Sequence, residues 1–382
     1  MANLQPVVGA VLDWAIQDAG QTVASLDLEL GFGGKLRLWI AEDELPNQGQ
    51  LAKIARRLGR PPSFFFLPEP PSAPAVSARY RKFAGTDRDT EPETIVGLRL
   101  ARNLQKTAEW VLDRIPSSGL TIPALKMGAD VEAAAQSLRQ WAGWTVLDQT
   151  TSKDYSGSSA AKMLRRRLEE RGVLVLHLTL DEDRTRGFSL ASERAPLVAV
   201  NTRDDYKPRL FSYVHELVHL ALGEGAVCDV HEDDEKTERF CNKVAAAFLM
   251  PAPDFRTHVK KQLRGRPVAT LDDVAAIRGR YRVSLRAAAI RAEHLRLATF
   301  GLYDRVNRLA ESKRKGGGGN IPGNERTKPR IRVDEYGFEF VRTVESGVES
   351  GLLRDAQAAD LMRVSTREWD EIRSLAHSGV VG

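Results

Sequence analysis

Hydrophobic residues recur every three or four positions over most of the chain, which is the spacing of amphipathic helices. In the first sixty residues the pattern predicts three helices, each closed by glycine or a polar turn: 7–20, 22–33 and 47–59. Further helices are predicted over 93–115, 130–144 and 158–172. Short runs rich in β-branched residues predict strands at 173–180 and 195–201, and 186–192 is a third candidate, at a cleft where an extended substrate could pair. The sequence therefore predicts an α+β protein that is mostly helical.

The segment from Lys207 to Gly225 combines a helical apolar stripe with the pattern H-E-x-x-H. His215 and His219 share one face of this helix, and Glu216 points about 100° round the axis. Two such imidazoles can bind one zinc ion, which lowers the pKa of a bound water to about 7, and the glutamate can accept the water proton. The pattern therefore indicates a zinc hydrolase with Glu216 as general base. The alternative is a core helix in which two histidines happen to share a face.

Zinc in such sites has three protein ligands, so another is needed. The next apolar pattern predicts a helix that begins at Glu238 and stops at Pro251, after a loop long enough to bring it alongside the first. We interpret Glu238 as the third ligand and Asn242, one turn later, as a partner that orients an imidazole. Manganese is the alternative metal. The competing ligands are Cys228, Asp229, His231, Glu232 and Cys241.

Two further questions about the expected site are the identity of the oxyanion-stabilising residue and the role of His177. A group that stabilises the developing oxyanion is required, and the sequence does not select among Arg209, Tyr213 and Tyr281. His177 alternates within its predicted strand, which favours a packed core histidine over a ligand.

The stretches FSYVHELVHLAL and TERFCNKVAAAFLMP, preceded by the two strands, resemble the ImmA/IrrE family of zinc metallopeptidases over roughly 160–296. Residues 50–71 resemble the end of the XRE-type helix-turn-helix domain that many members carry before the peptidase. The resemblance implies a zincin-like domain. Members cleave a DNA-bound repressor and so release genes for stress response or mobile-element transfer. Others of similar architecture are encoded beside a toxin and act as its antitoxin.

Residues 33–46 occupy the place of the recognition helix but depart from the family pattern. Gly33 and Gly34 loosen its start, and only Lys35 and Arg37 are placed to meet DNA. Base readout needs several polar side chains from one helix face, and phosphate contacts need more cations than two. A degenerate domain kept for packing or partner contact is the alternative to DNA binding.

Composition bounds these interpretations. A chain of 382 residues with 42% hydrophobic content can form two or three domains. No run approaches the roughly 18 apolar residues of a membrane span, and the N-terminus lacks the basic start of a signal peptide, so we expect a cytoplasmic protein. Two cysteines argue against a disulfide framework. The net charge of +5 is small for this length and permits contact with DNA without indicating it.

We expect five segments along the chain: a degenerate helix-turn-helix domain (1–71), a helical connector (72–157), the peptidase domain with trailing helix-turn-helix-like helices (158–300), a glycine-rich linker (301–330) and a small helical domain (331–382). Four consecutive glycines, Gly316 to Gly319, predict that the last domain is mobile relative to the peptidase.

The sequence therefore favours a zinc-dependent endopeptidase-like regulator, and the resemblance implies that its substrate is a partner protein, most simply a transcriptional repressor. One alternative is an antitoxin that binds a toxin encoded beside it. The other is a DNA-binding regulator whose peptidase fold is a sensor. Glu216 favours the enzyme, because a structural metal site does not need a base.

Overall fold

The computed structural model describes residues 4–71, 92–115, 121–150, 154, 156–180, 185–223, 234–306, 308 and 327–378. Two compact units account for these residues, one consisting mainly of the chain up to Asn103 and the other of the chain from Leu104 onward. The long helix α6 (Pro92–Leu112) contributes its first part to one unit and its last part to the other. No described helix is both long enough and apolar enough to cross a membrane.

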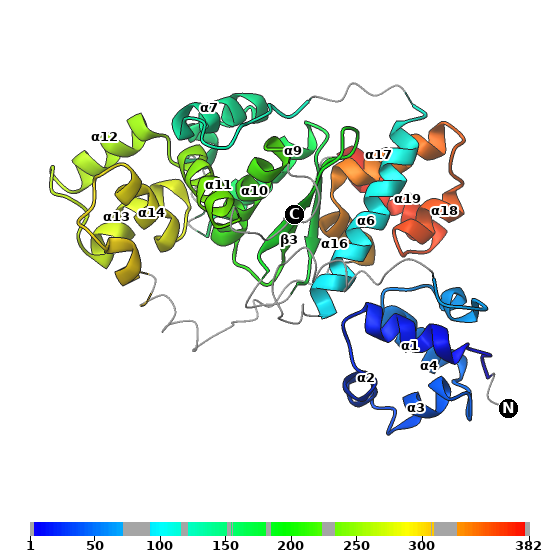
Figure 1. The fold of residues 1–382 in the computed structure, drawn as a ribbon. Coiled ribbons are helices and arrows are strands. Elements are labelled where there is room, and N and C mark those ends of the chain that lie inside the picture. Colours follow the sequence, from blue (N-terminus) through cyan, green and yellow to red (C-terminus); the bar gives the residue numbers. More distant parts are fainter. Residues whose placement is uncertain are drawn as a thin grey trace. The chain divides into compact units, whose positions relative to one another are not determined.

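The N-terminal unit is helical, as the periodicity predicts (Figure 1). Its elements are α1 (Gly9–Asp18), α2 (Val23–Leu30), α3 (Lys35–Ile40), α4 (Gln48–Arg57) and the 3-10 helix η1 (Pro62–Phe66). A capping box starts α4, where the Asn47 side chain accepts from the Gln50 backbone N–H at 2.9 Å and the Gln50 side chain accepts from Asn47 at 2.8 Å. Leu12, Ile16 and Trp39 are buried in the core of this unit.

A three-stranded sheet lies at the centre of the second unit, in the order β1-β3-β2. Strand β1 (Leu174–Leu178) pairs in parallel with β3 (Leu197–Asn201), and β2 (Gly187–Leu190) pairs antiparallel with the other side of β3. All residues of β1 and β3 are buried, so both faces of the sheet are covered. Figure 1 shows α9 and α10 on one side of the sheet and α16 on the other.

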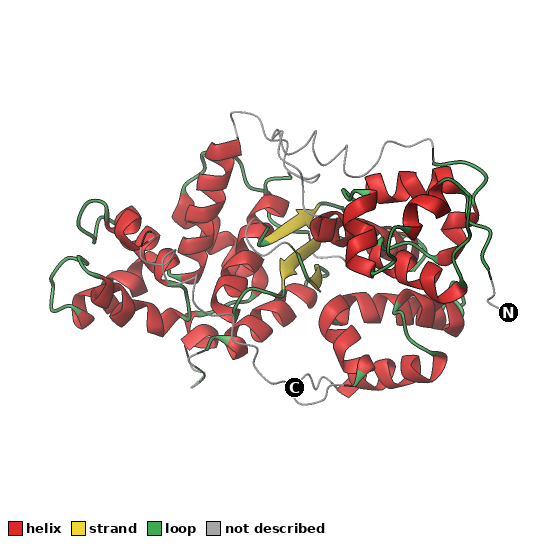
Figure 2. Cartoon of the chain, turned by 90° about the horizontal axis from the view of Figure 1, so that it is seen from below, coloured by secondary structure: helices red, strands yellow, loops and turns green. Residues whose placement is uncertain are grey.

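Eight further helices of the described residues belong to this unit, and of these α9 and α10 pack against the sheet (Figure 2). They are α7 (Val131–Ala142), α8 (Val146–Thr150), α9 (Ser158–Glu169), α10 (Tyr206–Ala221), α11 (Asp234–Leu249), α12 (Ala252–Gln262), α13 (Leu271–Tyr281) and α14 (Leu285–His294). Helix α7 buries Ala134, Ala135 and Leu138 and packs against α11. The expected connector over 72–157 thus contributes part of the core of the second unit, because the apolar face of α7 is covered by a helix far along the chain.

Four C-terminal helices complete the second unit: α16 (Lys328–Tyr336), α17 (Phe338–Glu349), α18 (Asp355–Leu361) and α19 (Thr366–Ser378). Helices α16 and α17 pack against β1, and α17 also contacts α9. This corrects the expectation of a mobile C-terminal domain, since its helices cover a strand that would otherwise be exposed. The glycine run that suggested mobility lies outside the described residues.

Gly337, between α16 and α17, permits this close packing. Its backbone has φ 82° and ψ 159°, a conformation that is essentially restricted to glycine. A Cβ atom there would lie 2.8 Å from the Val175 carbonyl oxygen of β1, and closer still to the Glu169 carboxylate. Position 337, between α16 and α17, therefore tolerates no side chain.

We expect Gly337→Ala to lower the free energy of unfolding by more than about 3 kcal/mol, because the backbone strain of about 1–3 kcal/mol is added to a clash with β1. Gly351→Ala is the matched control: Gly351 also has a positive φ of 71°, but nothing lies within 4 Å of its added Cβ. It should cost only about 1–2 kcal/mol. Urea unfolding of both variants measures the difference, and equal losses would contradict the packing of α16 and α17 on β1.

Candidate metal centre

Helix α10 carries the two histidines of the H-E-x-x-H pattern. Pro208 lies in its first turn, where no intrahelical N–H bond is lost, and Gly223 follows its end with φ 71°. Leu210, Val214 and Leu217 are fully buried. The predicted helix is confirmed, and His215 and His219 lie one turn apart with their Nε2 atoms 3.1 Å from each other.

Helix α11 brings Glu238 to these imidazoles. It packs against α10 and begins at Asp234, so Glu238 lies in its second turn and not at its start as the sequence suggested. One carboxylate oxygen is 3.2 Å from His215 Nε2 and the other is 3.1 Å from His219 Nε2. Burial acts to raise the pKa of Glu238, but hydrogen bonds from the two histidines outweigh it and hold the pKa well below its usual range.

The donor set fits a zinc ion. Ligand atoms of His215, His219 and Glu238 all lie within 4.8 Å of one another, and they are two imidazole nitrogens and one carboxylate. Donors bound to zinc at about 2.0–2.1 Å in a tetrahedral arrangement are about 3.3 Å apart, which is close to the separations of 3.1–3.2 Å seen here. Three ligands also leave a fourth position for water.

Of the competing ligands, only Cys241 lies among the described residues. Cys241 is a free, fully buried thiol one turn after Glu238. Burial raises the pKa of the Cys241 thiol, despite a hydrogen bond with His219, which disfavours the thiolate that binds metal. Cys228, Asp229, His231 and Glu232 lie outside the described residues.

Asn242 lies one turn after Glu238 but does not orient an imidazole in the part of the chain that is described. It forms no hydrogen bond with His215 or His219 there, and His215 Nδ1 is buried without a hydrogen-bond partner. Asn242 instead lines a neighbouring groove.

Glu216 lies between α10 and the sheet, with 7% of its surface exposed. Its carboxylate faces Gly187 at the start of β2: a Cβ on Gly187 would lie 3.3 Å from Glu216 Oε1 and 2.7 Å from the Ala199 carbonyl oxygen. Only glycine permits this approach, so Gly187 is a residue of the site that sequence reasoning missed. A glycine within a short strand was the available signal. The carboxylate of Glu216 therefore lies beside the edge strand of the sheet.

A groove of about 800 Å³ opens one helical turn from the metal ligands on both helices. Phe211, four residues before His215, and Asn242, four residues after Glu238, line it. The Phe211 and His215 ring centres are 6.3 Å apart. Four cationic side chains also line the groove: Arg186, Lys207, Arg278 and Arg286. Burial and the charges of Arg278 and Arg282 lower the pKa of Lys207, which shows how closely the cations are grouped.

None of the three oxyanion candidates faces the metal ligands. Tyr213 and Arg209 line a separate cavity, and the Tyr213 hydroxyl meets His177 Nε2 at 2.6 Å. Tyr281 donates its hydroxyl proton to Asp254 at 2.6 Å. His177 is a buried residue of β1, as expected.

The candidate DNA-binding residues lie on α3, which is only six residues long. Lys35 forms an exposed ion pair with Glu44 at 3.8 Å, and Arg37 is exposed. Leu36 and Trp39 of the same helix are buried. This helix offers few groups for base recognition, and DNA binding stays a prediction.

We expect His215→Ala and His219→Ala each to abolish stoichiometric zinc, and Glu238→Ala to weaken its binding, because each removes one of three donors. The matched control is His377→Ala, which removes an exposed histidine of α19. Zinc content after dialysis, measured by mass spectrometry on variants whose circular dichroism is unchanged, provides the test. Full zinc occupancy in both histidine variants would place the metal elsewhere.

Comparison with known families adds independent evidence. A family model described as the IrrE N-terminal-like domain matches residues 168–293, which run from the end of α9 through α14 and include both metal-binding helices. The N-terminal unit and the C-terminal helices lie outside this match. No curated protein matches the chain. Residues 168–293 of this chain are therefore similar to the IrrE N-terminal-like domain of the ImmA/IrrE metallopeptidase family.

Proposed function

We propose that this protein is a zinc-dependent endopeptidase that cleaves a partner protein, most simply a transcriptional repressor. The observation that carries the proposal is the combination of three converging donors with a separate buried carboxylate. His215, His219 and Glu238 would hold the metal, whereas Glu216 contacts none of them as a ligand and lies beside the edge strand. A purely structural metal site has no use for that fourth group.

A bound zinc ion would supply a Lewis acid that polarises the scissile carbonyl and acidifies a water molecule. The protein supplies the remaining parts. Glu216 would accept the proton of that water at its carboxylate and later deliver it to the leaving amine. Because the carboxylate is largely buried, few solvent molecules compete for the proton.

Strand β2 is suited to hold an extended peptide. One side of Gly187–Leu190 pairs with β3, and no strand pairs with its other side among the described residues. An added peptide strand would obtain main-chain hydrogen bonds there, next to Glu216. Residues of the peptide beyond β2 would continue into the groove lined by Phe211 and Asn242.

The groove favours acidic side chains in the substrate. Its four cations are accompanied by one acidic residue in the groove lining, Asp205, and one of the four, Arg186, also pairs with Asp204 at 3.4 Å. Such an excess of one charge selects the opposite charge and accelerates encounter with it. We therefore expect the cleaved segment to carry aspartate or glutamate near the scissile bond.

Substitution of Glu216 separates catalysis from binding. Glu216→Gln keeps the shape of the side chain and leaves the three donors in place, so it should retain zinc while cleavage falls by about a hundredfold or more. Glu170→Gln makes the same change at an exposed site of the α9 end and should leave activity unchanged. The assay mixes purified protein with the product of the adjacent gene, in zinc or manganese, and follows cleavage by mass.

Retention of full biological activity by the Glu216→Gln variant would eliminate the endopeptidase. That result would instead support the antitoxin alternative, in which the protein acts by binding its partner.

Reversal of one charge in the groove tests whether the groove binds the substrate. Arg278→Glu should raise KM for an acidic substrate peptide about fivefold with kcat unchanged, because it replaces attraction by repulsion away from the reacting bond. Arg256→Glu, on the exposed side of α12, is the matched control. Steady-state kinetics with the cleaved peptide gives both constants, and an unchanged KM would remove the groove from the substrate path.

A further inference from the structure

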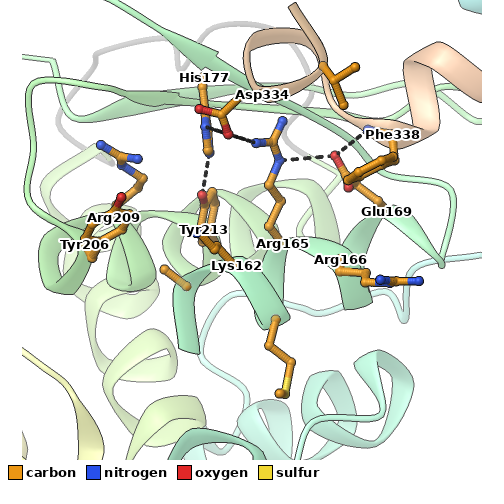
Figure 3. A pocket seen from close by; sticks show the side chains of 13 residues that line it. Lys162, Arg165, Arg166, Glu169, His177, Tyr206, Arg209, Tyr213, Asp334 and Phe338 are labelled. Atoms are coloured by element: carbon orange, nitrogen blue, oxygen red, sulfur yellow. Dashed lines mark hydrogen bonds and ion pairs between the residues drawn. The ribbon is translucent and has the colours of Figure 1, made fainter. Parts of the chain in front are cut away.

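A second cavity, of about 250 Å³, lies beside α10 (Figure 3). Tyr206, Arg209 and Tyr213 form a stripe along α10 in its wall. Tyr213 lies about 200° round the helix axis from His215. The other walls come from α9, β1 and the C-terminal helices, so the cavity is formed where the peptidase domain meets α16 and α17.

Arg165 of α9 organises the polar side of this cavity. Its Nε donates to Glu169 at 3.2 Å, and its Nη2 donates to the Val175 carbonyl at 2.9 Å. Its Nη1 lies 3.0 Å from His177 Nδ1 and 3.2 Å from the Asp334 carboxylate. Both acidic groups of the cavity lining, Glu169 and Asp334, are therefore already engaged by Arg165 (Figure 3).

This contact determines the protonation of His177. A guanidinium can only donate, and Arg165 Nη1 lies closer to His177 Nδ1, at 3.0 Å, than the Asp334 carboxylate does, at 3.4 Å, so we assign Nδ1 as the acceptor. The single proton of the neutral ring is then on Nε2, which donates to the Tyr213 hydroxyl oxygen at 2.6 Å. The hydroxyl proton of Tyr213 is left without an acceptor among the described residues, although the residue is only 1% exposed.

Arg209 supplies a second donor without a partner. Its Nη2 donates to the carbonyl oxygens of Thr202 and Asp204 at 3.0 and 2.9 Å, while its Nε is buried and has no hydrogen-bond partner in the described part of the chain. The two orphan groups, on Tyr213 and Arg209, come from one helical turn of the same stripe. A buried donor without a partner destabilises the protein, so a ligand that accepts from both groups would be bound favourably.

The remaining lining is cationic at the polar end and apolar elsewhere. Lys162 and Arg166 join Arg165 and Arg209 in the lining, against the two acids that Arg165 pairs. Met163, Val333 and Phe338 provide apolar surface. The volume is just below the range of about 300–1,000 Å³ that is typical of small-molecule sites, so the ligand is small. The lining matches a molecule with an anionic, hydrogen-bond-accepting head and an apolar body.

We propose that this cavity binds a small organic carboxylate. The carboxylate accepts hydrogen bonds from the Tyr213 hydroxyl and Arg209 Nε, and the apolar body packs against Met163, Val333 and Phe338. A planar carboxylate suits a guanidinium donor, and the apolar wall distinguishes an organic anion from inorganic phosphate. Because the stripe lies on the metal-binding helix and the opposite wall on α16, the ligand connects these two parts of the protein.

The proposal does not depend on peptidase activity, since binding alone tests it. Phenylacetate is the probe, because it joins one carboxylate to one apolar ring. Calorimetric titration of the full-length protein at low ionic strength should give saturable binding with Kd of about 1 mM or lower. Phenylacetamide, which keeps the shape without the charge, should bind at least about tenfold more weakly. Inorganic phosphate should bind more weakly than phenylacetate.

Tyr213→Phe removes only the orphan hydroxyl and should weaken phenylacetate binding about tenfold or more. Tyr303→Phe, a matched change in the groove beside the metal centre, should leave it unchanged. Since Tyr213→Phe also removes the acceptor of His177, a second variant avoids the core: Lys162→Glu, at an exposed position of the lining, should weaken binding several-fold, and more so at low salt.

Several outcomes would overturn the proposal. Absence of saturable phenylacetate binding up to about 10 mM would exclude the site. Equal binding of phenylacetamide would show that the site does not require an anion. Tighter binding of phosphate would show that the site does not require an apolar group on the ligand. If phenylacetate binds but neither Tyr213→Phe nor Lys162→Glu changes its affinity, it binds elsewhere.

Discussion

The burial of α10 on several sides is the constraint on which the rest of this protein depends. Its histidines face α11, which supplies Glu238, and Glu216 faces the sheet at Gly187. The stripe with Tyr213 faces His177 and the second cavity. A helix enclosed in this way cannot rotate to a new register without breaking all of these contacts at once. The geometry of the metal centre is therefore set by packing across the whole domain.

Arg165 of α9 links β1 to the C-terminal helices. It is buried, and it satisfies a carbonyl on the outer edge of β1 together with two carboxylates, one of them Asp334 of α16. Removing one partner of such a buried ionic group typically costs about 3–5 kcal/mol, because the remaining charge is left unpaired. Gly337 lets the backbone approach β1 at the same place. The C-terminal helices are thus part of the structure that supports α10.

The groove and the second cavity, both beside α10, differ in the chemistry of their lining residues as well as in position. The groove is large, opens next to the metal ligands and is lined by several cations, as suits an extended polypeptide. The second cavity is smaller and contains buried donors without partners, as suits a compact ligand. Tyr206 of α10 lines both of them, and their other lining residues differ.

The sequence by itself determined those features that depend on neighbours along the chain. The helical period and the spacing of His215, Glu216 and His219 specify a helix with a metal-binding face, and the pattern ending at Pro251 located the helix of Glu238, although its start was one turn too late. Only the tertiary structure decided which residues that are distant in the sequence lie in contact. Two such pairs are Gly187 with Glu216 and Asp334 with Arg165. The hydrophobic pattern of the sequence does not predict either contact. The glycine run suggested a mobile C-terminal domain, but packing against β1 depends on surfaces that exist only after the sheet has formed.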